Sequence, residues 1–174
     1  MNLFMPTVLL SSVTNITSDL LKKLDVSLLL VDVDNTLAHS KSPKPFDGVV
    51  EWLDDIKKSG YKIVIVSNNF DDRVSKFSNV LNLPYVSLSL KPFPFGFNKA
   101  KKIFPDYKDK ALVIGDQIFT DIMGANLLRM KSILLEPTQK DETRGMKIRR
   151  FFEKPIRAKI RKENEFLKDL EHKD

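Results

Sequence analysis

The stretch that decides the predicted fold is residues 28–37, LLLVDVDNTL. Its apolar residues suit a strand that is buried on both faces of a parallel sheet. The run ends in the carboxylates of Asp32 and Asp34, followed by the amide of Asn35 and the hydroxyl of Thr36. Two like charges at alternate positions repel each other, so we expect a positive group between them.

Similar short apolar runs recur along the chain and alternate with segments that have helical spacing. This alternation predicts an α/β fold: a three-layer α/β/α sandwich with a mostly parallel, five-stranded, Rossmann-like sheet. The predicted strands are residues 28–33, 62–66, 85–88, 111–114 and 132–135. The predicted helices are residues 49–60, 71–83, 95–104 and 119–130.

Polar side chains follow four of the predicted strands at the point where each strand ends. In an open parallel sheet, ligands bind at the carboxyl ends of the strands, near the switch in strand order. We therefore expect these side chains to converge on one magnesium-bound phosphate group. They are Asp32 and Asp34, then Ser67 and Asn68, then Lys91, and finally Gly115, Asp116 and Asp121.

These residue types favour Mg²⁺ chemistry on a phosphate. Mg²⁺ prefers oxygen ligands and takes one or two protein carboxylates, here Asp32 and Asp116, with the backbone carbonyl of Asp34 as a further ligand. Asp32 is the candidate nucleophile, because a carboxylate can attack phosphorus and form an aspartyl phosphate. Asp34 is placed to protonate the leaving oxygen and then to deprotonate the hydrolytic water. Ser67 and Lys91 would hold the phosphoryl oxygens.

The segments DVDNT, SNN, Lys91 and GDQIFTD carry a family resemblance. In this order and spacing they resemble the four motifs of haloacid dehalogenase-type (HAD) phosphatases. The resemblance implies Mg²⁺ as cofactor, Asp32 as nucleophile and Asp34 as acid/base. It implies Asp32, Asp34 and Asp116 as metal-site residues and Ser67, Asn68 and Lys91 as phosphate binders. It gives Asn35, Thr36, Gly115 and Asp121 supporting roles.

Other interpretations of the same residues were weighed. A calcium loop is excluded, because its glycine position is Leu37 and its closing glutamate position is Pro43. A D-x-D glycosyltransferase site leaves three strand ends unexplained, and a receiver-like or inactive α/β domain stays open. Taken alone, Ser67 and the two residues after it would form a helix-capping turn before Asp71, and Lys91 would be a solvated lysine.

The spacing of the motifs predicts an open site. Only 32 residues separate Asp34 from Ser67, and 23 separate Ser67 from Lys91. Each interval is already filled by one helix and one strand, and a separate domain needs about 50 residues or more. We therefore expect no cap domain, and an open site suits a large substrate such as a lipid, protein, nucleic-acid end or polysaccharide precursor.

The composition of the chain excludes some kinds of chemistry and indicates a compartment. The chain of 174 residues has no cysteine, which excludes disulfides and thiolate chemistry. The start carries neither a signal peptide nor a transit peptide pattern, so the cytoplasm is the expected compartment. The net charge is +6, but residues 144–162 contain nine basic residues and one acid, and the rest of the chain is close to neutral.

The basic stretch predicts a separate tail. We expect residues 1–140 to form the phosphatase domain, with residues 1–24 as a lead-in packed on it, and residues 141–174 to form a basic, partly amphipathic helical tail. Pro155 is expected to divide that tail into two helical pieces. Its apolar residues at helical spacing could bind an anionic membrane surface or cover the domain's own core. They are Ile148, Phe151, Phe152, Ile156 and Ile160.

A closer resemblance spans nearly the whole chain. The chain is similar to the capless subclass IIIA, YqeG-like branch of the HAD phosphatases, which is in turn similar to phosphatidylglycerophosphate phosphatases. The matching segments are residues 4–6, NIT at 15–17, DVDNTL, VSNNFDDRV, KPFPFGFNKA, VIGDQIFTDIMGAN and TRGMKIRRFFEKPI. This implies a Mg²⁺-dependent phosphomonoesterase of phospholipid and cardiolipin precursor synthesis, cytoplasmic or peripheral on the inner face of the membrane.

Two alternatives stay open for the function. One is a phosphatase for a soluble phospho-sugar, nucleotide or phosphoprotein. The other is a non-catalytic module that binds RNA or the ribosome through the basic tail, with nucleic acid as its partner. The sequence decides neither the oligomeric state nor the natural substrate.

Overall fold

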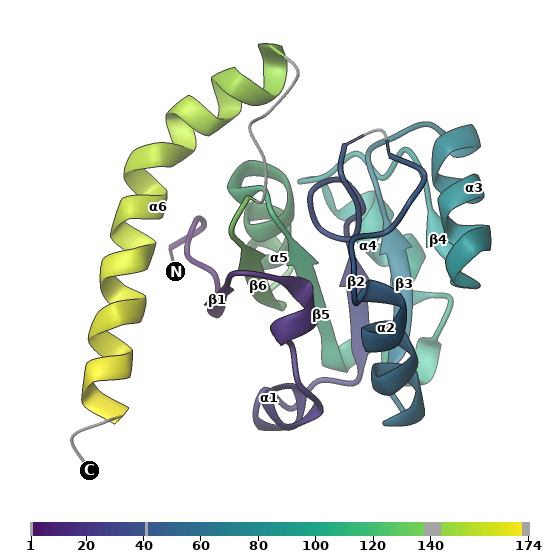
Figure 1. The fold of residues 1–174 in the computed structure, drawn as a ribbon, viewed down its shortest axis with the longest axis horizontal. Helices are drawn as coiled ribbons and strands as arrows, with labels where there is room; N and C mark the ends of the chain where they lie inside the picture. The colour runs from purple at the N-terminus through teal and green to yellow at the C-terminus, as the bar shows by residue number, and fades with distance from the viewer. Residues whose placement is uncertain (1, 41, 138–143, 172–174) are drawn as a thin grey trace.

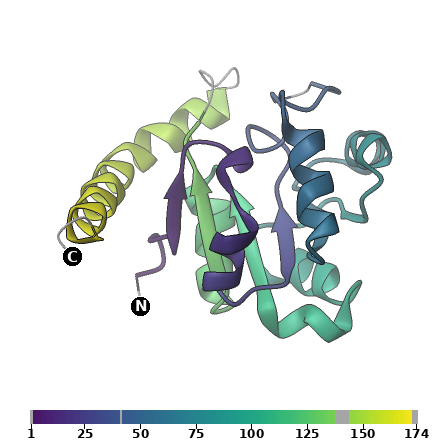
Figure 2. The same ribbon diagram turned by 60° about the horizontal axis from the view of Figure 1, so that its bottom comes forward.

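The chain folds around a six-stranded parallel sheet with helices on both faces (Figures 1 and 2). The computed structural model describes residues 2–40, 42–137 and 144–171. The strands are β1 (Val8–Leu10), β2 (Leu28–Val31), β3 (Lys62–Val66), β4 (Tyr85–Val86), β5 (Ala111–Gly115) and β6 (Lys131–Leu135). The helices are η1 (Val13–Asn15), α1 (Ser18–Lys23), α2 (Val49–Lys58), α3 (Asp71–Leu81), α4 (Pro94–Lys101), η2 (Pro105–Lys110), η3 (Ile118–Ile122), α5 (Met123–Leu127) and α6 (Arg144–Glu171).

The predicted α/β sandwich is confirmed, but the predicted number of strands is wrong. The strand order is β1-β6-β5-β2-β3-β4, and every neighbouring pair is parallel. The additional strand is β1, whose Val8 lies opposite Ile133 of β6. It has only three residues, the apolar Val8–Leu10, all of them half-buried at the border of the sheet, and this short run was not predicted as a strand.

The central strands form two cores because alternate side chains point to opposite faces. Leu29 and Val31 of β2 belong to the core under η1, α1, α2 and α3, whereas Leu28 and Leu30 pack with residues of α4 and α5. All four of these side chains are buried. This two-sided burial is why the motif reads as a continuous apolar run.

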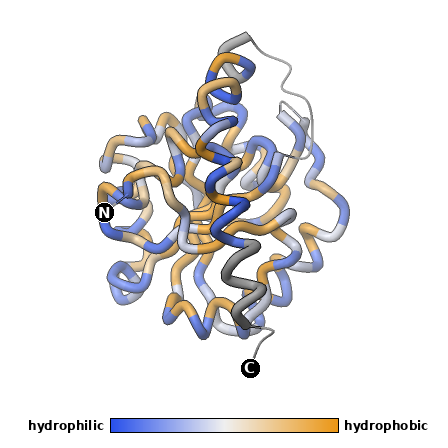
Figure 3. Tube along the Cα trace, turned by 90° about the vertical axis from the view of Figure 1, so that its left-hand side faces the viewer, coloured by the Kyte–Doolittle hydropathy of each residue, from blue (hydrophilic) through white to orange (hydrophobic). Residues whose placement is uncertain are grey.

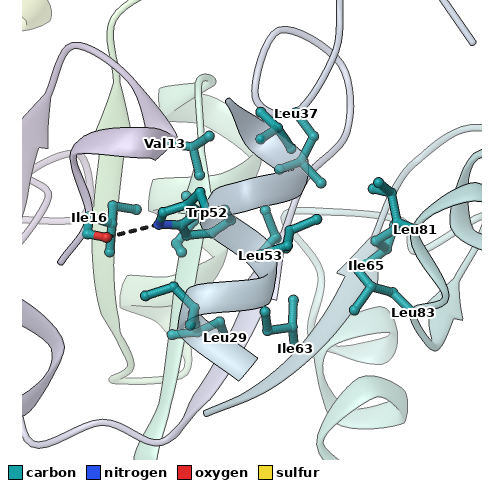
Figure 4. Close-up of a cluster of buried hydrophobic side chains, with 14 of the residues drawn as sticks. Val13, Ile16, Leu29, Leu37, Trp52, Leu53, Ile63, Ile65, Leu81 and Leu83 are labelled. Carbon is teal, nitrogen blue, oxygen red and sulfur yellow. Dashed lines mark hydrogen bonds between the residues drawn. The ribbon is translucent and has the colours of Figure 1, made fainter. Parts of the chain in front are cut away.

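The N-terminal segment is fastened to the sandwich by the single tryptophan. Trp52 of α2 is buried, and its Nε1–H donates to the carbonyl oxygen of Ile16 at 2.8 Å (Figure 4). Residues 2–24 of the predicted lead-in therefore contact the sheet through β1 and contact α2 through this hydrogen bond.

The C-terminal helix α6 runs along the border of the sheet beside β1 (Figure 2). The expected break at Pro155 is wrong, because α6 continues through that residue as one helix. The buried face of α6 explains this: Glu153 and Arg157 are buried, Ile160 is buried and Ile156 is half-buried, so packing holds the helix on both sides of the proline. Ile148, Phe151 and Phe152 are exposed, so only part of the apolar stripe covers the core. In Figure 3 the upper part of α6 alternates between hydrophilic and hydrophobic residues.

The predicted boundary between domain and tail, at residues 140 and 141, stays a prediction. Residues 138–143 lie outside the described part of the chain, as do Met1 and Lys41. Of the described helices, none is both long enough and apolar enough to cross a lipid bilayer.

Candidate active site

The predicted site residues meet at the carboxyl ends of the strands. Asp32 follows β2, Ser67 follows β3 and Asp116 follows β5, so the parallel sheet brings all three to one edge. An open pocket of about 450 Å³ lies there. It is lined by Asp32, Asp34, Ser40, Ser67, Asn68, Asn69, Arg73, Lys91, Gln117, Thr120 and Arg149.

Three buried carboxylates form the centre of the site. Each of Asp32, Asp116 and Asp121 offers an oxygen within 4.8 Å of the other two. The ammonium group of Lys91, which is also buried, lies 2.6 Å from Oδ1 of Asp32 and 2.7 Å from Oδ1 of Asp121. It also donates to the carbonyl oxygen of Val66 at 2.8 Å. This lysine bridges Asp32 and Asp121, and the expected positive group between Asp32 and Asp34 stays a prediction.

Burial and mutual repulsion control the protonation of these groups. Burial raises the pKa of Asp32 to about 8, since the nearby Lys91 only partly offsets the loss of water and Asp121 adds repulsion. Burial likewise raises the pKa of Asp116 to about 6, against the lowering effect of Arg150. Burial alone would lower the pKa of Lys91, but Asp121 and Asp32 outweigh it and hold that pKa above its usual range.

Asp34 lies in the same pocket but outside this cluster of three. Asn69 and Arg73, from the start of α3, both donate to its carboxylate. The carboxylate that joins Asp32 and Asp116 is that of Asp121 rather than that of Asp34. Asn69 and Arg73 therefore orient the carboxylate of Asp34 in the pocket.

Asn68 holds in place the loop that carries Lys91. Its Oδ1 accepts from the backbone N–H of Lys91 at 2.8 Å and from the hydroxyl of Ser89 at 2.8 Å. Its Nδ2 donates to the carbonyl oxygen of Lys91 at 3.1 Å. The hydroxyl of Ser67 accepts from the N–H of Asn69 at 3.2 Å, and this hydrogen bond stabilises the turn after β3.

The supporting residues shape the two loops. Asn35 has a φ of 58° and donates its N–H to Ala38 at 2.7 Å, which closes the loop after Asp34. Thr36 is buried in that loop. A Cβ added to Gly115 would lie 2.3 Å from the carboxylate of Asp121, so only glycine leaves room for that side chain there. Asp121 also accepts from the N–H of Gln117 at 3.1 Å.

Sequence reasoning missed the arginines of the site. Arg73 lies in the first turn of α3 and within the VSNNFDDRV segment, but nothing in its spacing pointed to Asp34. Arg149 and Arg150 were counted with the basic tail. In the structure Arg149 lines the pocket and donates to Gln117 at 2.9 Å, and Arg150 contacts the carboxylate of Asp116.

The centre has the donor set of a divalent cation site. Its ligands would be buried carboxylate oxygens, which Mg²⁺ and similar hard cations prefer. One of these oxygens, Oδ1 of Asp116, is buried and has no hydrogen-bond partner among the residues that the structure describes. A buried anionic oxygen without a partner is costly, and a cation at this point would remove that cost.

Residues 10–135 match the family described as haloacid dehalogenase-like hydrolase. The chain belongs to this family. The match spans strands β2 to β6 and the segments DVDNT, SNN, Lys91 and GDQIFTD, so the predicted HAD superfamily membership is confirmed. The predicted subclass and branch stay predictions.

Two relatives of this HAD hydrolase carry phosphatase names. The probable phosphatase YqeG of Bacillus subtilis (strain 168) is 35% identical over 134 residues, which cover 77% of this chain and 78% of the relative. The phosphoglycolate phosphatase of Aquifex aeolicus (strain VF5) is 30% identical over 82 residues, covering 42% of this chain and 38% of the relative. With the family match, they confirm the predicted enzyme class, a phosphatase that acts on a phosphorylated substrate.

Solved structures share the fold at low sequence identity. An uncharacterised protein from Listeria monocytogenes serotype 4b has 17% identity and a TM-score of 0.54, covering 68% of this chain and 85% of that chain. The HAD hydrolase YfnB from Bacillus subtilis, solved bound to magnesium, has 19% identity and a TM-score of 0.50, covering 60% of this chain and 50% of that chain. These likenesses support the HAD fold alone.

Proposed function

We propose that this chain hydrolyses phosphate monoesters with Mg²⁺ through an aspartyl phosphate formed on Asp32. The observation that carries the proposal is the contact of Asp32 with Lys91 inside a pocket, beside two further buried carboxylates. A carboxylate paired with a cation at the bottom of a pocket has the nucleophilic oxygen and the charge that a phosphoryl group needs.

Two aspartates divide the chemistry. A carboxylate oxygen of Asp32 attacks phosphorus, the bond from phosphorus to the ester oxygen breaks, and that oxygen takes the electron pair and a proton from Asp34. Asp34 then accepts a proton from a water molecule, whose oxygen attacks the phosphorus of the intermediate. Inorganic phosphate leaves and the carboxylate of Asp32 is restored. Asn69 and Arg73 keep the carboxyl of Asp34 oriented through both steps.

The remaining site residues bind rather than react. Lys91, Ser67 and Asn68 line the pocket and would hold the phosphoryl oxygens. Asp32, Asp116 and the backbone carbonyl of Asp34 would hold the metal, with Asp121 beside them. When bound, Mg²⁺ supplies positive charge that balances the carboxylates and the phosphoryl group.

An open mouth supports a large substrate. In the described chain, the interval from Asp34 to Ser67 holds α2 and β3, and the interval from Ser67 to Lys91 holds α3 and β4. Neither interval carries a domain that could close over the pocket. A lipid in a membrane is one substrate that such a site can reach.

Exposed apolar side chains flank the pocket on the segments that line it. Phe70 follows the pocket residue Asn69 and is 77% exposed, and Leu90 precedes Lys91. On α6, Phe151 is 66% exposed, two positions beyond the pocket residue Arg149. The same segments also expose Leu88, Phe93, Phe95, Ile148 and Phe152.

These features favour a lipid phosphate as substrate, with phosphatidylglycerophosphate as the leading candidate. Apolar side chains beside the mouth would enter the headgroup region of a bilayer, and cations such as Arg149 would attract its anionic lipids, each worth about 1 kcal/mol. We place the enzyme on the inner, cytoplasmic face of the membrane, bound peripherally through the basic residues of α6.

A panel of phosphate esters tests the reaction and its substrate. Wild type should release phosphate only with Mg²⁺ and fastest from phosphatidylglycerophosphate in vesicles, and Asp32→Asn should reduce release to the uncatalysed rate with every ester. Asp106→Asn, which changes an exposed aspartate outside the pocket, is the control and should match wild type. Release that survives Asp32→Asn would refute Asp32 as the nucleophile.

Vesicle flotation tests the membrane surface. Wild type should float with vesicles containing phosphatidylglycerol, and the double variant Phe151→Ser, Phe152→Ser should lose most of that binding while keeping activity on a soluble ester. Val80→Ser is the matched control, because Val80 is 66% exposed in the last turn of α3, away from the pocket. Equal flotation of the double variant and wild type would contradict this docking surface.

A soluble phosphate ester is the second candidate substrate. The partial similarity to a phosphoglycolate phosphatase supports it, because that name denotes action on a small soluble ester. The ester panel separates the two: a soluble-substrate enzyme prefers a soluble ester and gains nothing from vesicles.

A further inference from the structure

Helix α6 reaches the metal-binding centre from outside the HAD motifs. It lies along β1 and contacts η3, the turn that carries Asp121 (Figure 1). Three of its charged side chains, spaced three and four residues apart, face the loop after β5. They are Arg150, Glu153 and Arg157, and the last two are buried.

These side chains hold both ends of the loop from Asp116 to Ile118. Nη1 of Arg150 donates to the carbonyl oxygen of Asp116 at 2.7 Å, and Arg157 donates to the same oxygen. At the other end, Oε1 of Glu153 accepts from the N–H of Ile118 at 2.8 Å. The two arginines also pair with Oε2 of Glu153, at 2.8 Å for Arg150 and 3.2 Å for Arg157.

Arg150 binds only one of the two oxygens of the Asp116 carboxylate. Nη2 of Arg150 donates to Oδ2, whereas Oδ1 is buried and, within the described part of the chain, has no hydrogen-bond partner. An arginine that contacts both the backbone and the side chain of one residue leaves that side chain little freedom to rotate, because the guanidinium fork is planar. The carboxylate is thereby held with one oxygen bound to α6 and the other not, in a cluster with the carboxylates of Asp32 and Asp121.

We propose that α6 is part of the metal site, with Arg150 as the positioning residue that presents Oδ1 of Asp116 to the cation. The inference rests on the proposed Mg²⁺ dependence and adds to it. Groups that hydrogen-bond to a ligating carboxylate orient it, and their loss typically weakens metal affinity 10- to 100-fold. Glu153 and Arg157 support Arg150, since each buried charge in the network faces an opposite one.

Two competing roles make different predictions. If Arg150 were a rival cation for Asp116, its removal would strengthen metal binding. If the network only fastened α6 to the sheet, loosening α6 elsewhere would have the same effect as changing Arg150. Arg161 offers the matched control: it is an arginine on the same helix that pairs with Glu136 at 2.7 Å and does not contact Asp116.

The experiment is a Mg²⁺ titration of the full-length, metal-free protein by calorimetry, with the thermal midpoint measured in the absence of metal. Arg150→Gln should bind Mg²⁺ about 10- to 100-fold more weakly than wild type, and Arg150→Lys should fall between them because it keeps the charge and loses the fork. Arg161→Ala should bind Mg²⁺ like wild type, even if its thermal midpoint falls. If Arg150→Gln does not fold, Arg150→Lys carries the comparison.

The inference fails if the Arg150 variants bind Mg²⁺ as tightly as wild type or more tightly, or if Arg161→Ala weakens binding as much as they do. Phosphate release by wild type is measured separately, so this failure leaves the proposed hydrolysis intact. Conversely, wild type that binds Mg²⁺ in an Arg150-dependent way but hydrolyses no ester would remove the proposed function and keep the inference.

Discussion

Asp32 is surrounded by more negative than positive charge, and this governs its chemistry. Asp116 and Asp121 lie beside it, and Lys91, which pairs with it, is shared with Asp121. Burial and this repulsion raise its pKa to about 8, so near pH 7 the metal-free protein holds Asp32 mostly protonated. A nucleophile must be ionised, so a cation that stabilises the carboxylate also activates it.

Metal binding should therefore release a proton. With the pKa of Asp32 at about 8 and that of Asp116 at about 6, Mg²⁺ uptake at pH 7 should expel close to one proton, and its affinity should rise about tenfold per pH unit from pH 6 to 8. The folded-state pKa values of both aspartates lie above their unfolded-state values. The free energy of unfolding of the metal-free protein should therefore fall as the pH rises from about 4 towards 8.

Calorimetry in buffers with different protonation enthalpies measures the proton release. The release should shrink towards zero at pH 9, and Asp32→Asn should lose most of it at pH 7. An equal release at pH 7 and pH 9 would show that Asp32 is already ionised before the metal binds.

Single elements depend on contacts that cross long stretches of sequence. The η1 turn and α1 are held against α2 by the hydrogen bond from Trp52 to Ile16, 36 residues apart (Figure 4). Neither segment is long enough to be stable alone. Their position over the sheet therefore depends on tertiary contacts of this kind.

Trp52→Phe tests that dependence. The variant keeps an aromatic ring but leaves the carbonyl oxygen of Ile16 without its donor, so the free energy of unfolding should fall by about 1–3 kcal/mol. Urea unfolding followed by circular dichroism measures it, because the variant lacks the only tryptophan. Val50→Ala, at a 47% exposed position of the same helix, should change stability by less than about 0.5 kcal/mol. Equal effects would contradict the tether.

The elements that sequence reasoning recovered are those with strong local patterns. Apolar runs in the sequence predict strands β2, β3, β5 and β6. The parallel packing of these strands then brings Asp32, Ser67 and Asp116 together. Strand β1 is only three residues long and half-buried, and α6 continues through Pro155 because of packing that sequence periodicity does not encode. The contact from Arg150 to Asp116 spans 34 residues and links two different elements, so its pattern in the sequence is that of any basic helix.

At the scale of the whole molecule, the proposed metal site joins segments from both halves of the chain. Asp32 follows β2, Asp116 follows β5 and Asp121 lies in η3, and α6 contacts the loop between the last two residues. A ligand that binds only this folded arrangement stabilises the whole fold by mass action.

Mg²⁺ should accordingly raise the thermal midpoint. At one hundred times its dissociation constant, the stabilisation is about 2.7 kcal/mol, or roughly 5–10 °C for a chain of this size. Differential scanning calorimetry with and without Mg²⁺ measures the shift, with Na⁺ at matched ionic strength as the control. Asp116→Asn should abolish the shift, and a shift that persists in this variant would place the cation elsewhere.

The outline of the sheet has a consequence for how copies of this chain meet one another. Its border strands are the shortest, with three residues in β1 and two in β4, and α6 lies against β1. Long, exposed border strands are templates on which other chains can add and aggregate. Border strands this short offer little unpaired backbone for such growth. The longer parallel strands at the centre of the sheet can therefore carry the site without an aggregation-prone strand at either border.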